Sequence, residues 1–469
     1  MQRGTVFYTA PTHCSEYFFH AQRGDLMTVE ELKKAVIEKI DENRERIIEI
    51  GGSLYAHPEL GYKEVFATDF VSGEMEKLGL EVNRNIAVTG CSAQINKDKK
   101  GPSIALMGEL DAVICWEHPD SDKETGAVHA CGHNIQVAVM LGTAIGLIES
   151  GIPEYLDGSI TLMGVPSEEY VEIEYRSSLA DKGKIRFFGG KQELIYRGLL
   201  DDIDISMMVH SLDISSSGKK VLVGPQGNGF VGKQIRFKGK EAHAGAAPHE
   251  GINALNAAVL AMNNIHAQRE TFPDEEKIRV HPVITKGGDI VNIVPADVRM
   301  ESYVRGRTTD GILDANKKVT RAIQAGAMAV GAQVNIKDIP GYLPLLKNTE
   351  LDECFKENAQ VFVRKDEIQD GASFAGSFDI GDISHIMPVL HPLIGGVRGN
   401  IHTREFMMDD PELAYIIPAK VMAMTIIDLL QDGAEKAKRI ISAYKPKMSK
   451  ESYIEFMNSV SKDVDFQGI

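Results

Sequence analysis

The sequence is short of cysteine, of long apolar runs and of basic charge. Its five cysteines are odd in number and scattered over 469 residues, which fits a reducing compartment better than a disulfide framework. The apolar run nearest to a membrane span covers only residues 137–148, against the roughly 20 residues that a span needs. A formal net charge of −16 argues against phosphate-backbone binding, which needs clustered Lys and Arg. We therefore expect a cytoplasmic protein that binds neither nucleic acid nor membrane.

What is present is the composition of a folded protein with more than one core, at 43% hydrophobic and 25% charged residues. Ser103–Met107 and Ser159–Gly164 have the pattern of buried strands, and a helix is expected between them at Val137–Ser150. Strands that alternate with helices predict an α/β domain, in which flanking helices cover a central, mostly parallel sheet.

The pattern changes near Gly224, where short alternating runs replace the long apolar strands. Four strands and two helices are predicted here: strands at 233–238, 278–285, 298–304 and 334–336, and helices at 252–268 and 310–328. They predict a compact α+β unit with a four-stranded antiparallel sheet. Because the α/β pattern returns after Pro340, the unit is expected to be inserted into the first domain as a lid.

These changes of pattern give the expected division of the chain. Residues 1–26 lack any period, and the capping box of Thr28 and Glu31 then starts a helix. Either Met27 is the native start, or residues 1–26 are an arm that packs on the body or on a partner. The predicted units are an extension of uncertain order (1–26), the first catalytic part (27–223), the lid (224–338), the second catalytic part (339–446) and a tail that adds a short helix or frays (447–469).

Cys131, Gly132 and His133 stand directly before the predicted helix. With Gly between them in an extended turn, the thiolate and the imidazole can reach one metal cluster. The helix N-terminus behind them also favours thiolate over thiol. The alternative is a buried cysteine beside a capping histidine.

Glu168 and Glu169 directly follow a predicted strand. Adjacent carboxylates at such a place can have two different roles. One can bind a metal ion, while the other takes a proton from metal-activated water. The alternative is a solvated acidic turn.

Three further residues are expected at the same edge of the sheet. His210 ends an apolar run, His402 follows a Gly-rich segment, and Asp111 follows the strand at 103–107. Asp111 could orient a ligand histidine, or it could be an ordinary helix cap. One Cys, three His and one Glu match a paired divalent-metal site, for which Cys and His favour Zn, while Mn and Co are also compatible.

The lid contributes its own candidates. His243 lies among small residues and could donate a hydrogen bond to a developing oxyanion. Asn292 and Arg305 are an amide and a guanidinium that suit a substrate carboxylate. Taken singly, each of the three could be structural.

Six motifs in order carry a resemblance to a known family. They are HPELGYKE (57–64), GELDA (108–112), ACGHN (130–134), the P-x-E-E of 166–169, HAGAAPHEGINAL (243–255) and SFDIGDIS (377–384). From about residue 27 to 444 the chain resembles the di-metal peptidases and amidohydrolases that include aminoacylase, carboxypeptidase G and the auxin-conjugate amidohydrolases. Within that family it is most similar to the aminobenzoyl-glutamate hydrolase type.

The resemblance implies a catalytic domain interrupted by a lid that forms a homodimer interface. It implies two divalent metal ions bridged by Cys131, with Glu168 as general base and Asp111 as a further catalytic residue. The other implied ligands are His133, Glu169, His210 and His402. It further implies that His243 reaches the active site of the partner subunit, and that Asn292 and Arg305 hold the carboxylate of the substrate.

Three positions depart from the family pattern. Glu109 stands where the peptidase branch has a metal-binding His, which favours the amidohydrolase branch. Asn134 and Gln136 stand where auxin-type members carry Asp and His, which weakens the case for an auxin-like substrate.

The predicted function is hydrolysis of the amide bond in N-acyl amino acids, N-aroyl ones such as aminobenzoyl-glutamate included. One alternative is a metallo-dipeptidase or carboxypeptidase acting on short peptides. Another makes Cys131 a covalent nucleophile with His133 as its base. A third is a non-catalytic metal- or peptide-binding protein that keeps the fold.

Overall fold

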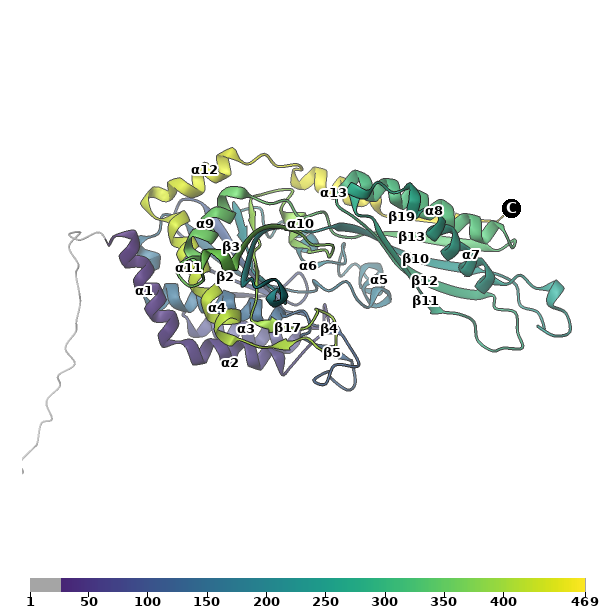
Figure 1. The fold of residues 1–469 in the computed structure, drawn as a ribbon, viewed down its shortest axis with the longest axis horizontal. Coiled ribbons are helices and arrows are strands. Elements are labelled where there is room, and N and C mark those ends of the chain that lie inside the picture. Colours follow the sequence, from purple (N-terminus) through teal and green to yellow (C-terminus); the bar gives the residue numbers. More distant parts are fainter. Residues whose placement is uncertain (1–26, 469) are drawn as a thin grey trace, which may run out of the picture.

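A larger α/β domain and an elongated lid make up the computed structural model, which describes residues 27–468 (Figure 1). The predicted extension at 1–26 lies outside the described residues.

The core of the larger domain is a six-stranded sheet. Its strands in spatial order are β1 (Val82–Ile86), β2 (Gly90–Ile95), β6 (Ser159–Val165), β3 (Ser103–Glu109), β7 (Ile205–Met207) and β15 (Val389–Leu390). β6, β3, β7 and β15 run parallel, and β1 and β2 add an antiparallel edge. Every residue of β3 and β6 is buried, as expected for strands covered on both faces. The predicted α/β fold is therefore confirmed.

Helices cover both faces of this sheet. On β3, Ile104 and Leu106 belong to the apolar core that contains α4 (His133–Glu149) and α11 (Ile417–Leu430). Ala105 and Met107 face the opposite way, toward α6 (Gly190–Arg197). This alternation is what the two-residue period of a strand dictates.

Smaller elements complete the domain. The remaining helices are α1 (Val29–Glu42), α2 (Arg44–Tyr55), α3 (Val65–Lys77), α5 (Ile173–Asp181), α9 (Thr349–Ala359), α10 (Ile380–Ile383) and α12 (Glu435–Ala443). A second sheet has the order β14 (Ile368–Ser373), β9 (Val221–Gln226), β16 (Leu393–Ile394) and β8 (His210–Ser211). Two short pairs are β4 (Val113–Ile114) with β5 (Ala127–Val128), and β17 (Val397–Arg398) with β18 (Met407–Met408).

One helix corrects the expectation about apolar runs. Residues Glu412–Leu430 form a 19-residue helix that is long and apolar enough to cross a membrane, longer than the run at 137–148. Its most apolar stretch is 94% buried inside the protein, and Lys420 and Asp428 are paired with Asp41 and Lys33 at 2.6 and 2.7 Å. These charges interrupt the apolar run in the sequence. The helix is a core helix, and the cytoplasmic location stays a prediction.

The lid is built on an antiparallel sheet with one strand more than predicted. Its order is β11 (Arg279–Lys286), β12 (Asp297–Gly306), β10 (Gly229–Lys238), β13 (Gln333–Pro340) and β19 (Lys462–Phe466). α7 (Ala254–Ala267) and α8 (Thr309–Met328) pack on one face. The inserted lid with two helices is thus present, but the prediction of four strands was wrong because β19 comes from the tail.

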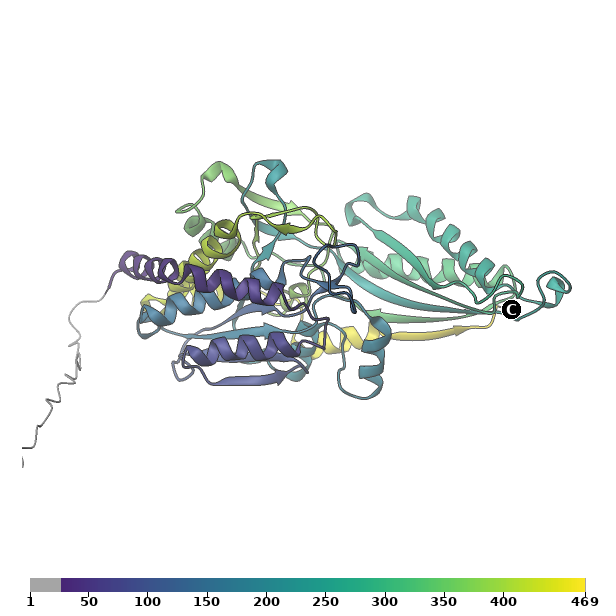
Figure 2. The ribbon, with the colours of Figure 1, turned by 90° about the horizontal axis from the view of Figure 1, so that it is seen from below.

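The tail spans the junction between the two domains. Its helix α13 (Lys450–Val460) lies between them and leads into β19 along the edge of the lid (Figure 2). The hydroxyl of Tyr453 donates to Asp382 Oδ1 of the catalytic domain at 2.7 Å, while Val460 packs against Val231 and Ile312 of the lid. The helix part of the prediction for the tail holds, and its strand was not foreseen.

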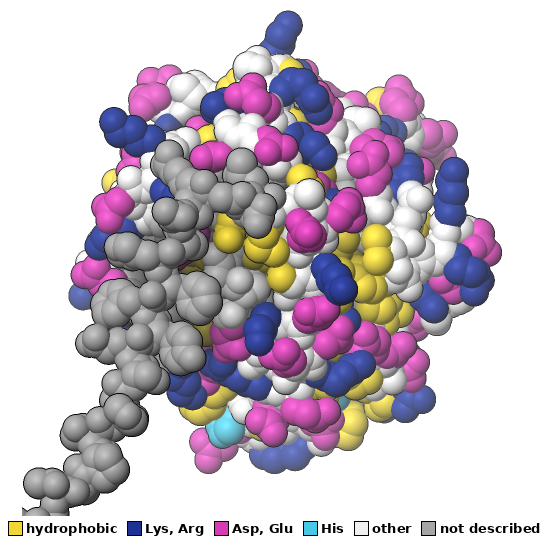
Figure 3. All heavy atoms as spheres, turned by 90° about the vertical axis from the view of Figure 1, so that its left-hand side faces the viewer, with side chains coloured by type: hydrophobic (Ala, Val, Ile, Leu, Met, Phe, Trp, Pro, Cys, Tyr) yellow, Lys and Arg dark blue, Asp and Glu magenta, His cyan; other side chains and the backbone are white. Residues whose placement is uncertain are grey.

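Acidic and basic side chains are interspersed on the end of the catalytic domain that Figure 3 shows. Among the described residues of this face, neither sign of charge forms a continuous stripe.

Close helix packing around α4 depends on glycine. A Cβ at Gly146 would lie 2.5 Å from Ile40 Cγ1 of α1, so Gly146→Ala overpacks this contact. We expect a loss of about 1–3 kcal/mol in the free energy of unfolding, measured by chemical denaturation. Gly52→Ala is the control, because that helical position has open space around it and alanine there stabilises by about 1 kcal/mol at most. Equal stabilities of the two variants would contradict the packing argument.

Candidate functional site

The candidate residues gather where the parallel strands end. β3 ends at Glu109 and leads to Asp111, and β6 ends at Val165 and leads to Glu168 and Glu169. In open α/β sheets this edge is where ligands bind.

Gly132 explains how Cys131 and His133 reach the same place. Its φ of +80° lies in the left-handed region, and a Cβ there would be 2.0 Å from Ser211 Oγ. Only glycine fits this conformation without strain. The turn carries the chain directly into α4, so that the thiol and the imidazole both face the cluster.

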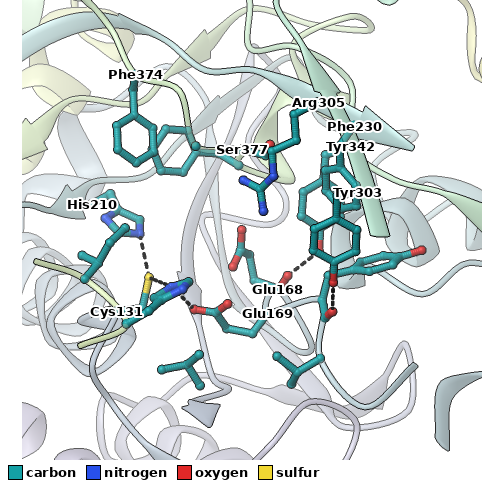
Figure 4. Close-up of a pocket in the computed structure, with 17 residues that line it drawn as sticks. Cys131, Glu168, Glu169, His210, Phe230, Tyr303, Arg305, Tyr342, Phe374 and Ser377 are labelled. Atoms are coloured by element: carbon teal, nitrogen blue, oxygen red, sulfur yellow. Dashed lines mark hydrogen bonds and ion pairs between the residues drawn. The ribbon is translucent and has the colours of Figure 1, made fainter. Parts of the chain in front are cut away.

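Two groups of potential ligands share the thiol of Cys131. The first group consists of Cys131, His133 and His210, and the second consists of Cys131, Glu169 and His402. Within each group the ligand atoms lie within 4.8 Å of one another. Cys131 Sγ is 3.5 Å from His210 Nε2 and 3.3 Å from His402 Nε2. His402 Nε2 is 2.9 Å from Glu169 Oε1 (Figure 4).

The chemistry of these residues fits divalent ions. Nε2 of His133 is fully buried and makes no hydrogen bond within residues 27–468, although Glu109 Oε2 lies 3.1 Å from it, and its Nδ1 is 2.8 Å from the backbone oxygen of Asp111. A ring held in this way offers Nε2 as a ligand. The set of thiolate, imidazole and carboxylate suits Zn or a similar ion.

The surroundings of Cys131 favour the thiolate. Burial and the neighbouring Glu169 raise the pKa of this thiol, but His402, His210 and His133 lower it further, to about 6. The cysteine therefore supplies an anionic sulfur at neutral pH, which is the form that binds metal.

The two adjacent glutamates differ in their electrostatics. Burial, with Glu109 and Glu169 nearby, raises the pKa of Glu168 well above its ordinary value. Burial also raises the pKa of Glu169, but His402 and His133 outweigh it and bring that pKa to about 2. Environments that separate two carboxylates in this way assign them different roles. Glu169 is a permanent anion, and Glu168 can carry a proton.

Asp111 connects the two halves of the cluster. Its Oδ2 accepts a hydrogen bond from the backbone N–H of Glu169 at 2.8 Å, and its Oδ1 is 3.3 Å from His133 Nδ1. It therefore contacts one residue from each ligand group.

A pocket of about 250 Å³ opens beside the cluster. Arg305 of β12 reaches it from the lid, and Figure 4 shows its guanidinium pointing toward Glu168. The guanidinium stacks over the rings of Tyr303 and Phe230 at 5.3 and 5.6 Å. No carboxylate of the described residues forms an ion pair with it, so this cation is free to bind an anionic ligand.

Two predicted residues lie outside this pocket. His243 and Asn292 are exposed on the lid. The N–H of Ala244 donates to the backbone oxygen of Asn292 at 3.0 Å, and His243 forms an isolated antiparallel β-bridge with Ile293. The structure thus brings Asp111, the metal-ligand candidates, Glu168 and Arg305 together in one chain, and it leaves His243 and Asn292 apart from them.

Sequence reasoning missed a buried lysine beside the site. Lys191 lies in the first turn of α6 and pairs with Glu109 and Asp379. Asp379 stands in the motif SFDIGDIS, but no role was predicted for it. The one available signal was a lysine that follows two glycines at the start of α6.

Comparisons with known proteins show which proteins the chain is similar to. Residues 228–329 match the model of a peptidase dimerisation domain. The chain is 28% identical over 425 residues to the Xaa-Arg dipeptidase of Mus musculus, a match that covers 86% of this chain and 90% of that protein. It is 26% identical over 350 residues to the N-acetyl-L-cysteine deacetylase of Bacillus subtilis, covering 73% and 78%.

Solved structures share the fold. The aminobenzoyl-glutamate utilization protein of Klebsiella pneumoniae matches with a TM-score of 0.63 and 17% identity, covering 85% of this chain and 99% of that one. A dinuclear metal-binding peptidase of the M20 family from Bacillus subtilis matches with a TM-score of 0.60 and 21% identity, covering 83% and 99%. The family resemblance predicted from the sequence is thereby confirmed: the chain is similar along most of its length to peptidases and amidohydrolases, and the protein is a hydrolase of amide bonds.

Proposed function

We propose that the protein is a two-metal amidohydrolase that removes the acyl group from N-acyl amino acids, with Glu168 as general base. One observation carries the proposal: the carboxyl of Glu168 lies beside two ligand groups that share one thiol. Its Oε2 is 3.7 Å from Nε2 of His133, and it lines the pocket that Arg305 enters. A base, a cluster of potential metal ligands and a substrate cation thus surround one space.

Two divalent ions bound to these groups would acidify water and polarise the amide carbonyl. The residues of the chain supply the rest. Glu168 takes the proton from the attacking water and returns it to the leaving amine, a role that a raised pKa suits. The hydroxyl of Tyr342 donates to the backbone oxygen of Glu168, which fixes the segment that carries the base.

The residues that line the pocket support a substrate that is an amino acid with an apolar or aromatic acyl group. Arg305 offers its free guanidinium to the substrate carboxylate. Across the pocket, Phe374 and Phe378 stack with their ring centroids 5.0 Å apart, and both line the pocket. A planar acyl group fits beside such rings. Aminobenzoyl-glutamate has both features, and the Klebsiella pneumoniae protein of similar fold is named for that compound.

A second candidate is a dipeptidase. The Xaa-Arg dipeptidase of Mus musculus matches along most of its length, and a dipeptide presents the same amide bond and the same carboxylate. A basic side chain at the leaving residue would need a carboxylate of its own in the pocket. Those that line the pocket are Glu168 and Glu169, which the mechanism uses. The pocket therefore favours substrates without an added cation.

The lid supports a homodimer in which His243 acts on the partner subunit. β19 covers the β13 edge of the lid sheet, whereas β11 is the other, open edge. Val283 of β11 and Val291 in the next loop are exposed, as expected of a surface that a second copy covers. His243 lies beside that loop. It would reach across the interface to stabilise the oxyanion.

Metal dependence follows from the shared ligand groups. We expect about two divalent ions per chain by elemental analysis, and hydrolysis of acetylated amino acids or aminobenzoyl-glutamate that chelation abolishes. Adding Zn, Mn or Co restores activity to the same sample. Activity that survives full removal of metal would instead make Cys131 a covalent nucleophile.

Glu168→Gln keeps the shape of the side chain but removes the base. We expect kcat to fall by about 10²- to 10⁴-fold, while the two ions stay bound. Glu172→Gln is the matched control, because Glu172 lies in the same segment but pairs with Lys63. Retained turnover in Glu168→Gln would exclude the residue as the base.

Arg305→Met tests recognition of the carboxylate. Hydrogen bonds to a charged group contribute about 1.5–3 kcal/mol, so kcat/KM should fall by about 10- to 150-fold. The same substrate with a carboxamide in place of its carboxylate should show little change. The control is Arg307→Met, two residues along the chain, where the exposed guanidinium bonds to Gln226. An equal loss on acid and amide would refute a carboxylate-specific role.

A further inference from the structure

Lys191 is a fully buried cation next to the cluster. Its side chain has no exposed surface, its Nζ is 2.5 Å from Glu109 Oε1, and it also pairs with Asp379. Burying charges costs several kcal/mol for each ion unless each is paired and hydrogen-bonded. The ammonium stays charged, because Asp379, Glu109 and Glu168 raise its pKa by more than burial lowers it.

Glu109 is held on both sides. The side-chain amide of Gln136 donates to its Oε2 at 2.7 Å, and the backbone N–H of Glu109 donates to Gln136 Oε1 at 3.2 Å. Lys191 occupies its other oxygen. The carboxylate is therefore fixed in position by two buried partners.

The fixed oxygen faces the histidine of the first ligand group. Glu109 Oε2 lies 3.1 Å from Nε2 of His133, although Nδ1 of that ring is already directed at the backbone oxygen of Asp111. In the neutral ring a lone pair on Nε2 would face a carboxylate oxygen, and a metal ion between the two atoms would make this arrangement favourable. Two ligand atoms about 2.1 Å from one ion lie roughly 3.4 Å apart at a tetrahedral angle, close to the separation here.

We propose that Lys191 is a positioning residue for the metal position at His133, because it holds Glu109, whose ligand atom groups with those of His133 and Glu168, where that carboxylate faces the ion. The proposal rests on the two-metal function. Buried partners that orient metal-binding groups change metal affinity by about 10- to 100-fold when they are removed. The second group, with Glu169 and His402, makes no contact with Lys191, so its ion should be unaffected.

The same ammonium ties this metal position to the pocket wall. The backbone N–H of Lys191 donates to Asp379 Oδ2 at 3.2 Å, and Asp379 directly follows Phe378 in the wall. Lys191 therefore joins α6, the end of β3 and the segment before α10 at one point.

The chain offers a matched control in a second buried lysine. Lys233 of the lid also has no exposed surface, and its Nζ is 2.5 Å from Asp338 Oδ1. Lys233→Met leaves the buried carboxylate of Asp338 without its cation, and Lys191→Met leaves those of Glu109 and Asp379 without theirs, so both should lower the midpoint of chemical denaturation. Only Lys191→Met should also lower the affinity of the protein for one of the two ions.

The measurement is titration of the metal-free full-length protein with Zn by calorimetry and with Co by visible absorption. Wild type and Lys233→Met should bind two ions. Lys191→Met should bind one ion as wild type does and the other about 10- to 100-fold more weakly. Two unchanged affinities in Lys191→Met would overturn the inference alone, whereas a wild-type protein without bound metal would overturn the two-metal function.

A double variant separates positioning from charge balance. Lys191→Met with Glu109→Gln removes the ammonium and one of its two carboxylate partners, while Asp379 stays charged, so stability should recover in part while the weak ion stays weak. Recovery of both would show that Lys191 serves stability only, and it would overturn the inference. If Lys191→Met does not fold, the near-isosteric Glu109→Gln tests the same arrangement: it should weaken one ion about tenfold, and two unchanged affinities would again refute the proposal.

Discussion

The structure depends on holding several buried carboxylates close together. Glu109, Asp111, Glu168, Glu169 and Asp379 are each at most 7% exposed, and all lie near the ends of the central strands. Such crowding of like charge is tolerable only with nearby opposite charge and hydrogen bonds. Lys191, the three histidines and the backbone N–H of Glu169 supply part of this compensation, and bound cations would supply the remainder.

The lid completes the site from the other side. Arg305 and Tyr303 extend from β12 over the cluster, and Tyr342 follows the return of the chain from β13. In the proposed function the catalytic domain provides the groups that act on the amide bond, while the lid provides the cation for the carboxylate. A substrate that contacts both sets favours one relative position of the two domains.

Local patterns were sufficient for the parts of the site that lie on single strand ends. The pair Glu168–Glu169 and the turn Cys131–Gly132–His133 could be placed because strands and helix starts leave clear signals. Lys191 could not be placed, since the burial of a lysine depends on Glu109 and Asp379, which are far away in the chain. The fifth strand of the lid was missed for a related reason: Lys462–Phe466 is mostly exposed and polar, and only the edge of β13 makes it a strand.

That strand also determines what counts as a folding unit. β13 ends at Pro340, but its partner strand begins only at Lys462, so the inserted segment by itself does not contain the whole lid sheet. Until residues 462–466 pair with it, β13 presents unpaired N–H and C=O groups along one edge. Chains can aggregate at an edge of this kind. The second half of the catalytic domain lies between the two strands in sequence. The lid is therefore inserted in sequence but cannot complete its fold independently, and the two domains are coupled in folding.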